Sequence, residues 1–598
     1  MPIPADDPEP LTGRCGGSES SADIPFSAPP PAAIAAVPRA RVAGLDVVRG
    51  VALLGILLLN IVDFAWPSQA YDSVSALYYT TDSIGEISDP DAPDSKSDEA
   101  KKDGAKPDED PKEESKEEKS KQDDWMFLAD PKPDLKGAYP AGVVRIAAAS
   151  TVWDIVEWAV VRVFFANKMR TLFCLLFGAG LIYLTDGLIG KGIRPVWLYY
   201  RRMLLLLLIG LLHGSLIWQG DILYGYAAVG FYLYPFRRLE AKTLARVGVG
   251  IFLSIIVLLW VGIGVFQLIK IRGPVLQAQV LAAAAETLVA EGAKAVEAEA
   301  GAAEVPEAGV DEEAAGASIA APDAGRNAAR KQAVEALGFV DRLILRGYRA
   351  LLRRDESPRP ERLTRDIRLH RDGTWLAQVK ARMKDSLWPR LGILTPVSLL
   401  AFGWLMILGM SLAKSGFFAA EWPVERYRLL AFRLVPLGWV IEALVILLSR
   451  GLRRDSILNL GVLIPVEQAV IPMLSLGYAA AIILLMRSGH WRGVTDRLAM
   501  VGRMALSNYL AQSILCTTLF YSFGLRLYGS VPRIGLVPIV FAVWAVEIWW
   551  SPRWLARHPS GPVEWCWRSL AALECQPWRR APASTLEEAP DQVPQNVR

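Results

Sequence analysis

Long apolar runs are the feature that most constrains what this chain can fold into. A helix that crosses the hydrocarbon core of a bilayer needs about 20 predominantly apolar residues. Of the 598 residues, 52% are hydrophobic, and the mean hydropathy is +0.26. We therefore predict an all-α fold, a polytopic transmembrane helical bundle of about ten spans. The runs cover residues 47–66, 171–187, 202–218, 222–236, 246–268, 391–413, 427–449, 457–486, 501–523 and 533–550.

One further apolar stretch, residues 143–165, is interrupted by charges. It contains Arg145, Asp154, Glu157 and Arg162. This mixture favours an interfacial or partly buried helix over a spanning one. An eleventh span is the alternative, and it would invert part of the topology.

Composition divides the chain into two membrane halves, residues 44–268 and 391–575, with disordered tails at 1–43 and 576–598. The N-terminal tail lacks the basic and apolar regions of a cleavable signal peptide. A charged loop, residues 82–136, interrupts the first half, and an Ala/Glu- and Arg-rich insert, residues 269–390, separates the halves. Both segments contain too few large apolar residues to bury a core, so we interpret them as extramembrane spacers.

Basic loops predict the orientation of the helices, because Lys and Arg resist translocation. One basic cluster, residues 191–202, precedes the third span, and another, residues 237–246, follows the fourth. Placing both in the cytoplasm puts the turn at 218–221 and the two polar segments outside, with both termini inside. The basic residues at 450–454 fall outside on this topology and argue against it for the later helices.

Ionisable residues inside apolar runs are costly in lipid, so each is a candidate for function. His213 lies near the end of the third span, and Asp221 opens the fourth. A tight helical hairpin brings the two together. A carboxylate on one ring nitrogen would fix the tautomer of a proton-transferring histidine. Alternatively, His213 bonds a neighbouring helix and Asp221 is only a helix N-cap.

The first span carries a second set of polar residues. Asp46 and Arg49 are three positions apart and so share a helical face, and Asn60 lies near the other end. The Arg49 guanidinium either extends to the lipid headgroups or holds a phosphate or carboxylate.

The ninth span carries a third set, in which Asn508 and Gln512 share one face and Arg503 lies at the inner end. Hydrogen bonding between helices is one explanation of these residues. The other is a polar pocket assembled from spans one, three, four and nine.

Several kinds of chemistry lack support in the sequence. The five cysteines show no ligand spacing, so we expect no metal site. A P-loop, a dinucleotide fingerprint, an HExxH motif and a nucleophile elbow were not found, and nothing points to nucleic-acid binding. The segment RHPSGPVEWCWR after the last span is typical of a docking segment at the inner interface.

Five separated motifs together resemble the YeiB-like family of bacterial inner-membrane proteins, whose C-terminal part is a domain of unknown function. The motifs are LDVVRGVALLGILLLNI, LFCLLFGAG, YRRMLLLLLIGLLHGSLIWQGDILYGYA, GRMALSNYLAQSILCTTLFYSFGLRLYG and GPVEWCWR. They cover the membrane part on both sides of the insert. The family's aromatic ending is replaced here by SLAALECQPW. The resemblance implies a multi-pass protein of the bacterial cytoplasmic membrane.

The family is similar in fold to membrane acyltransferases, which take an acyl group from a cytoplasmic thioester and deliver it to an acceptor across the membrane. The resemblance implies acyl-CoA as co-substrate, no bound cofactor, and an envelope or small-molecule acceptor. It makes His213 the general base or transient acyl carrier and Asp221 its orienter. Arg49 and Arg503 become candidates for the donor's phosphates. A solute transporter and a non-catalytic membrane scaffold stay open as alternatives, as does the oligomeric state.

Overall fold

The computed structural model describes residues 43–67, 80–81, 144–145, 152–301, 321–354, 360–393, 399–452 and 457–580. Within these residues the fold is all-α, as predicted, apart from one two-residue antiparallel pair, β1 (Thr80–Thr81) with β2 (Val144–Arg145). The charged loop 82–136 and most of both predicted tails lie outside the described residues.

Helix α1 (Ala43–Ala65) is the centre of the bundle, and most of its residues are buried. It contacts α5 (Lys168–Ile189), α18 (Arg492–Arg503), α19 (Ala505–Phe520) and α20 (Arg533–Arg557). Gly50 and Gly502 lie where α1 and α18 cross, and a Cβ on either would collide with the backbone of the other helix. Glycine at both positions therefore permits the close crossing.

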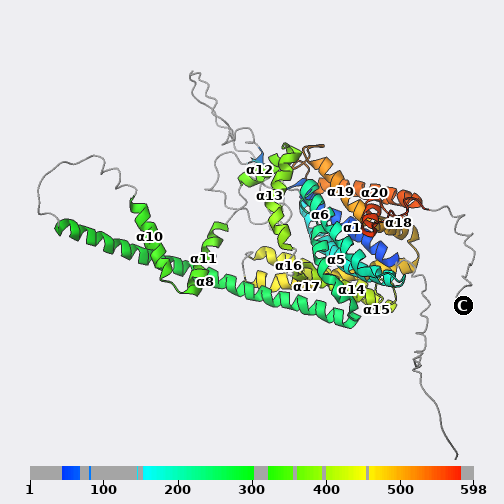
Figure 1. Ribbon diagram of the computed structural model, residues 1–598, viewed down its shortest axis with the longest axis horizontal. Helices are drawn as coiled ribbons and strands as arrows, with labels where there is room; N and C mark the ends of the chain where they lie inside the picture. Colours follow the sequence, from blue (N-terminus) through cyan, green and yellow to red (C-terminus); the bar gives the residue numbers. More distant parts are fainter. Residues whose placement is uncertain are drawn as a thin grey trace, which may run out of the picture. The chain divides into compact units, whose positions relative to one another are not determined.

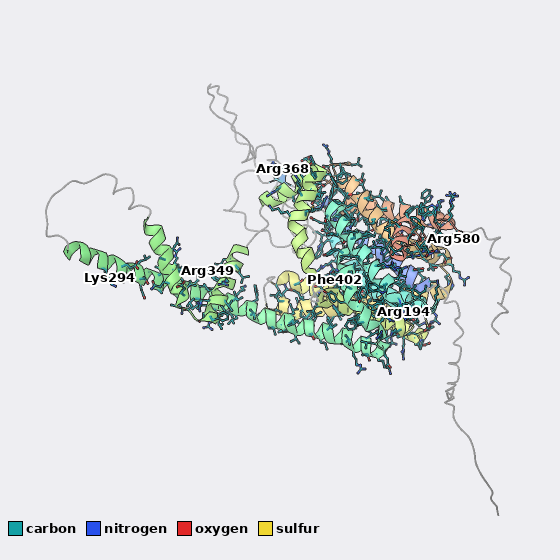
Figure 2. All side chains as sticks on the ribbon, viewed as in Figure 1. Arg194, Lys294, Arg349, Arg368, Phe402 and Arg580 are labelled. Carbon is teal, nitrogen blue, oxygen red and sulfur yellow. The ribbon has the colours of Figure 1, made fainter. Side chains whose placement is uncertain are left out.

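The other elements follow the apolar runs. Side chains fill the space between the helices (Figure 2), where the Phe402 ring lies 6.0 Å from the ring of the buried Tyr226. The remaining elements of the two membrane halves are α6 (Pro195–Leu212), η4 (His213–Ile217), α7 (Leu223–Leu233), η5 (Tyr234–Arg238), η6 (Leu399–Gly403), α14 (Trp404–Lys414), α15 (Val424–Arg428), η7 (Leu429–Leu434), α16 (Val435–Gly451), η8 (Asn459–Leu463), α17 (Ile464–Ser488) and α21 (Pro562–Ala572).

Among the described residues, seven helical stretches are long and apolar enough to cross a membrane. The chain is thus a membrane protein, and the seven stretches match seven of the predicted spans. The predicted spans at 222–236, 391–413 and 501–523 correspond to the shorter helices α7, α14 and α19, of 11, 11 and 16 residues. Pro235 follows α7 within a tight 3₁₀ turn, which ends the α-helix early.

The charged stretch before the second span joins that span. Helix α4 (Val152–Val160) and the π-helical η3 (Val161–Phe165) lead into α5, and together they form one candidate span, Val152–Ile189. The stretch is interrupted at Asn167, which has a φ of 60°. Asp154 and Glu157 are buried, as expected for a partly buried helix. Because α4, η3 and α5 together count as one candidate span, the stretch adds no separate eleventh span.

The large insert begins inside a helix. Helix α8 (Ala241–Gly301) runs unbroken through position 269, and α10 (Ala321–Glu335) and α11 (Phe339–Arg354) pack against its later part (Figure 1). The contact buries Leu276 and Val280 against Ile344 and Leu345. The insert therefore has a small apolar core of its own.

Two more helices of the insert, α12 (Pro360–Arg371) and α13 (Trp375–Ile393), are docked on the bundle. The buried Gln378 amide donates to the Ser522 hydroxyl at 2.9 Å, and the Ser522 N–H donates to the His370 carbonyl. The interpretation of the whole insert as a spacer is therefore wrong for this part. Buried polar side chains make specific bonds here in place of a large apolar core.

Candidate functional site

His213 and Asp221 form a buried pair at the end of α6. The His213 Nδ1 atom lies 2.9 Å from Asp221 Oδ1, and both side chains are at most 1% exposed. The other oxygen, Asp221 Oδ2, accepts the Tyr224 N–H at 2.8 Å in the first turn of α7. The predicted proximity is confirmed, and Asp221 both orients the histidine and caps the helix.

The pair leaves one ring nitrogen of His213 without a partner. A carboxylate oxygen can only accept, so Nδ1 carries the proton of the neutral imidazole and Nε2 carries a lone pair. His213 Nε2 is buried and makes no hydrogen bond within the described residues. A buried basic nitrogen held in this way is suited to accept a proton from a substrate.

Aromatic rings surround the pair. The Tyr509 ring of α19 lies 5.2 Å from the His213 ring, and the Trp218 ring lies 6.4 Å away. Trp218 stacks on Phe64 of α1 at 4.1 Å. Spans one, three, four and nine do meet here, as predicted. They meet through these rings and the His213–Asp221 pair, whereas Arg49 and Asn508 lie elsewhere.

The docked helix α13 covers the chain beside His213. The Arg382 guanidinium donates to the carbonyls of Ser215 and Leu216, each at 3.1 Å, and Trp375 Nε1 also donates to the Leu216 carbonyl. These carbonyls belong to η4, whose π-helical turn leaves them available. Arg382 is 3% exposed, so the contact excludes water from this side of the site.

Tyr528, in the loop between α19 and α20, contacts the docked helix α12. The Tyr528 hydroxyl donates to Asp366 Oδ2 at 3.2 Å, and the Tyr528 ring stacks on His370. Burial raises the pKa of Tyr528 well above its usual value, and the neighbouring Asp366 carboxylate raises it further. The phenol therefore stays protonated and remains a donor.

Asp46 and Arg49 lie at the opposite end of α1. Arg49 Nη1 bonds Asp46 Oδ1 at 3.0 Å, so the carboxylate neutralises the arginine. Fifteen residues separate Arg49 from Phe64, or about 22 Å along the helix. These two residues therefore do not share a pocket with His213, whereas the half-buried Asn60 lies only one turn before Phe64.

Arg503 lies level with Arg49, as predicted, since α18 and α19 meet beside the first turn of α1. Its Nη2 atom donates to the Pro559 carbonyl at 3.5 Å. The segment that follows contains α21, which docks on the bundle. Glu564 accepts the N–H groups of Leu506 and Ser507 and the Ser507 hydroxyl, and so caps α19. The segment docks on the bundle, as predicted, and its place at the inner interface stays a prediction.

Asn508 and Gln512 face α20 and not His213. Asn508 Nδ2 donates to the Val501 carbonyl and to Ser551 Oγ, and its Oδ1 accepts Trp550 Nε1 at 3.0 Å. Gln512 Nε2 donates to Glu547 Oε2 at 3.0 Å. These amides make the bonds between helices that one reading of the sequence expected.

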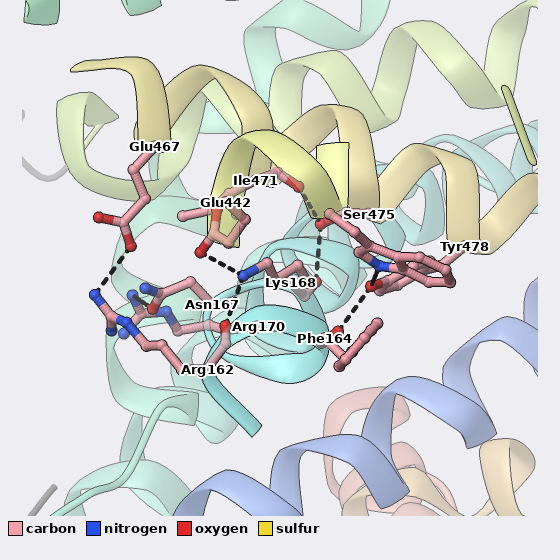
Figure 3. A network of polar contacts seen from close by, with 11 residues as sticks. Arg162, Phe164, Asn167, Lys168, Arg170, Glu442, Glu467, Ile471, Ser475 and Tyr478 are labelled. Carbon is pink, nitrogen blue, oxygen red and sulfur yellow. Dashed lines mark hydrogen bonds and ion pairs between the residues drawn. The ribbon is translucent and has the colours of Figure 1, made fainter. Parts of the chain in front are cut away.

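The sequence analysis missed a network of ion pairs between η3, α5, α16 and α17 (Figure 3). Lys168 Nζ bonds Glu442 Oε1 at 2.7 Å and the Arg162 carbonyl at 2.9 Å, and both charged side chains are at most 1% exposed. Beside them Arg162 pairs with Glu467 at 3.1 Å. The signal was an acid within each of the apolar runs 427–449 and 457–486, but nothing in the sequence identified their partners.

A similar pair fixes α4. Arg533 Nε bonds Glu157 Oε2 at 2.6 Å, and Asp154 accepts the Ile534 N–H at the start of α20. A small cavity lies between α1, α4 and α20, lined by Leu59, Val62, Trp158, Val161, Arg162, Ala166 and Arg533. Both arginines in its lining already form ion pairs with glutamates.

No group of three or more potential metal ligands occurs in the part of the chain that the structure describes. Cys174 donates to the Tyr226 hydroxyl in the core, and Cys516 is fully buried. Both cysteines are packing residues, as expected from their place in apolar runs.

Comparison with known proteins places the C-terminal half in a family. The family model described as "Protein of unknown function (DUF418)" matches residues 412–574. This region includes α17 to α21 and therefore Tyr509 and Glu564. No solved structure matches the chain.

Two relatives extend the similarity to the N-terminal half. The uncharacterized protein YeiB of Escherichia coli (strain K12) is 26% identical over 557 residues, which cover 89% of this chain and 97% of the relative. The uncharacterized protein YxaH of Bacillus subtilis (strain 168) is 28% identical over 428 residues, covering 71% of this chain and 85% of the relative. Residues 412–574 therefore match the DUF418 family, and most of the chain is similar to the YeiB and YxaH proteins.

Proposed function

We propose that this protein is a membrane-embedded acyltransferase that moves an acyl group from a thioester donor to a hydroxyl or amine acceptor. The observation that supports the proposal is the His213–Asp221 pair with its buried, unbonded Nε2 atom. Base and orienting carboxylate in hydrogen-bond contact are the arrangement that activates a nucleophile in acyl transfer.

In the proposed step, His213 Nε2 takes the proton of the acceptor's hydroxyl as the oxygen attacks the thioester carbonyl. The bond between carbonyl carbon and sulfur then breaks, and the leaving thiolate takes the proton from the imidazolium. Asp221 stabilises the positive charge of the imidazolium between the two transfers. In the alternative, Nε2 itself attacks the thioester and carries the acyl group before the acceptor does.

The experiment uses the purified protein in lipid nanodiscs with acetyl-CoA and palmitoyl-CoA, and measures release of free CoA. We expect His213→Ala to lower the rate by roughly 10²- to 10⁴-fold. His370→Gln is the matched control. His370 is also buried, and its Nδ1 atom lies near an aspartate. It belongs to the docked insert, however, and its ring stacks on Tyr528. Equal rates in wild type and His213→Ala would refute the mechanism.

We also propose that the protein is a multi-pass protein of the bacterial cytoplasmic membrane, with both termini in the cytoplasm and Asp221 toward the outer side. The basic loops at 191–202 and 237–246 support this orientation. A cysteine at the exposed Gln219, in a background without the native cysteines, should react with an impermeant maleimide in intact cells. A cysteine at Lys191 should react only after lysis, and the reverse pattern would overturn the orientation.

A solute transporter is the second candidate, and one observation favours it. The interrupted helix at Asn167 lies beside the Lys168–Glu442 pair, and broken helices with buried charges are common at transport sites. A transporter would release no CoA in the nanodisc experiment. Its solute transport would instead require Lys168 and Glu442. Under the acyltransferase proposal, replacing these two residues affects only the stability of the protein.

A further inference from the structure

Helix α11 of the insert exposes a group of large apolar side chains. Ile344 and Leu345 of this helix are buried against α8. Phe339, Val340 and Leu343 are not, and their exposed fractions are 71%, 60% and 49%. Three large apolar residues within five positions therefore face the surroundings of the insert.

The same helix is strongly basic. Its only acid is Asp341, which pairs with Arg272 of α8 at 3.4 Å. Its arginines are Arg342, Arg346, Arg349, Arg353 and Arg354. Of these, Arg342 and Arg346 are exposed. A helix that combines exposed apolar residues with arginines is typical of a membrane surface.

Helix α11 crosses α8 just beyond the apolar run at 246–268 of that candidate span (Figure 1). A Cβ on Gly347 would lie 2.9 Å from Ile269 Cδ1, and a Cβ on Gly273 would collide with Tyr348. The α8 residues at this crossing follow the run by one to five positions, or about 2–8 Å along the helix. The headgroup layer on each side of the hydrocarbon core is about 5–8 Å thick. With α8 across the bilayer, α11 therefore lies at the depth of the headgroups.

The contacts also fix how α11 is turned about its own axis. Gly347 meets Ile269, at the end of the crossing nearer to the apolar run. The Arg349 Nε atom donates to Gln277 Oε1 at 2.9 Å, about 12 Å further along α8. We call the edge of α11 with Gly347 the near edge and the edge with Arg349 the far edge.

Helical spacing assigns the exposed residues to these two edges. Val340 and Leu343 precede Gly347 by seven and four positions, so they lie on the near edge. Arg342 and Arg346 lie on the far edge, because they precede the arginine that bonds Gln277 by seven and three positions. The apolar edge of α11 is thus turned toward the bilayer and the arginine edge away from it.

We propose that α11 is a surface anchor that lies in the headgroup layer and binds anionic phospholipids. The near edge places its apolar side chains among the lipids, and the long arginine side chains of the far edge reach headgroup phosphates. A protein partner could cover the apolar residues, but the depth of α11 and its excess of arginines favour lipid. The proposal is independent of the acyl transfer and holds for either orientation of α8.

The first experiment measures the depth of α11 with a nitroxide label on the full-length protein, in a background without the native cysteines. The nanodiscs contain phosphatidylcholine and phosphatidylglycerol in equal parts. A label at Val340→Cys should collide more often with oxygen, which concentrates in lipid, than with a water-soluble nickel complex.

Ala328→Cys is the matched control for this label. Ala328 is exposed on α10, where Gly325 lies beside Leu288 of α8, about 30 Å beyond the apolar run. A label there should collide mainly with the nickel complex. Equal access of that complex to both labels would overturn the proposal, and a surface reserved for a protein partner would give this result in nanodiscs.

The second experiment tests the lipid charge by hydrogen–deuterium exchange of the α11 amides. They should exchange more slowly with phosphatidylglycerol present than in phosphatidylcholine alone. Arg342→Gln/Arg346→Gln should reduce this protection by about fivefold for each arginine. Both side chains are exposed, so the helix itself should stay folded.

Arg330→Gln/Lys331→Gln is the control for this charge change. It removes two exposed cations from α10 and should leave the protection of α11 unchanged. Equal exchange of α11 in the two lipids, or equal losses in the two double variants, would overturn the binding of anionic phospholipids by α11.

Discussion

The pairs His213–Asp221 and Lys168–Glu442 look alike in burial and differ in what they leave free. Both are acid–base pairs at most 1% exposed, with bonds of 2.9 and 2.7 Å. The Lys168 ammonium is bonded to a carboxylate and a carbonyl, within a network that also holds Arg162 and Glu467 (Figure 3). His213 uses one nitrogen for its carboxylate and leaves the other unbonded.

We propose that this difference separates a structural pair from a reactive one. An ammonium that bonds its counterion inside a bundle holds helices together and has no lone pair to offer. An imidazole with one nitrogen fixed by a carboxylate presents a base at the other. Burial and charge are common to both pairs, so the free lone pair is the feature that points to chemistry.

The largest effect on stability is expected for Lys168→Met. It leaves the Glu442 carboxylate buried without its cation, which should cost about 3–5 kcal/mol of unfolding free energy. The double variant Lys168→Met/Glu442→Leu should recover most of that loss, because neither charge remains to be desolvated. Unfolding of the purified proteins in a denaturant series measures both. A double variant as unstable as the single one would contradict this account of the pair.

Asp221→Asn tests the reactive role proposed for the His213–Asp221 pair, with an expected loss of about a hundredfold or more in CoA release. The amide can present its N–H₂ group to His213 Nδ1, which moves the imidazole proton to Nε2 and removes the base. The Tyr224 N–H keeps an oxygen acceptor, so the fold should survive. Circular dichroism checks the fold, and wild-type turnover in this variant would rule out the orienting role.

Opening of the docked insert should follow Arg382→Gln, at a cost of about 2 kcal/mol for the lost charge-assisted bonds to the η4 carbonyls. We expect the amides of α13 to exchange with deuterium roughly tenfold faster or more. Lys380→Gln on the exposed side of α13 is the control. Unchanged exchange in Arg382→Gln would mean that other contacts hold the insert.

Asn508→Leu should have the smallest effect. Its amide bonds Ser551 and Trp550 on α20, so its loss should cost about 1–2 kcal/mol of stability and change CoA release by less than about twofold. Thermal unfolding and the turnover assay measure these together. A large loss of turnover at normal stability would return Asn508 to the active site.

The sequence predicted the features that depend on local pattern. Apolar runs located most spans, and the short turn between His213 and Asp221 made their contact predictable, because a hairpin of this length leaves the two ends close. Arg503 was placed level with Arg49 from topology alone. In each case the partners are near in sequence, or their positions follow from helix direction.

Contacts between distant segments were beyond the sequence pattern. Lys168 and Glu442 are 274 positions apart, and Arg382 reaches η4 from an insert that reads as polar spacer. The predicted polar residues also do not form one pocket, because the face of α19 that contains Asn508 lies against α20. The next residue, Tyr509, lies on the face of α19 that contacts His213. Composition alone cannot tell which of these two faces of α19 lies toward His213.

The most direct test compares CoA release by His213→Ala with release by the double variant Lys168→Met/Glu442→Leu, at equal amounts of folded protein in nanodiscs. The account predicts near wild-type turnover for the double variant and a loss of roughly 10²-fold or more for His213→Ala. Turnover retained in His213→Ala but lost in the double variant would contradict it and move the functional site to the network around Lys168.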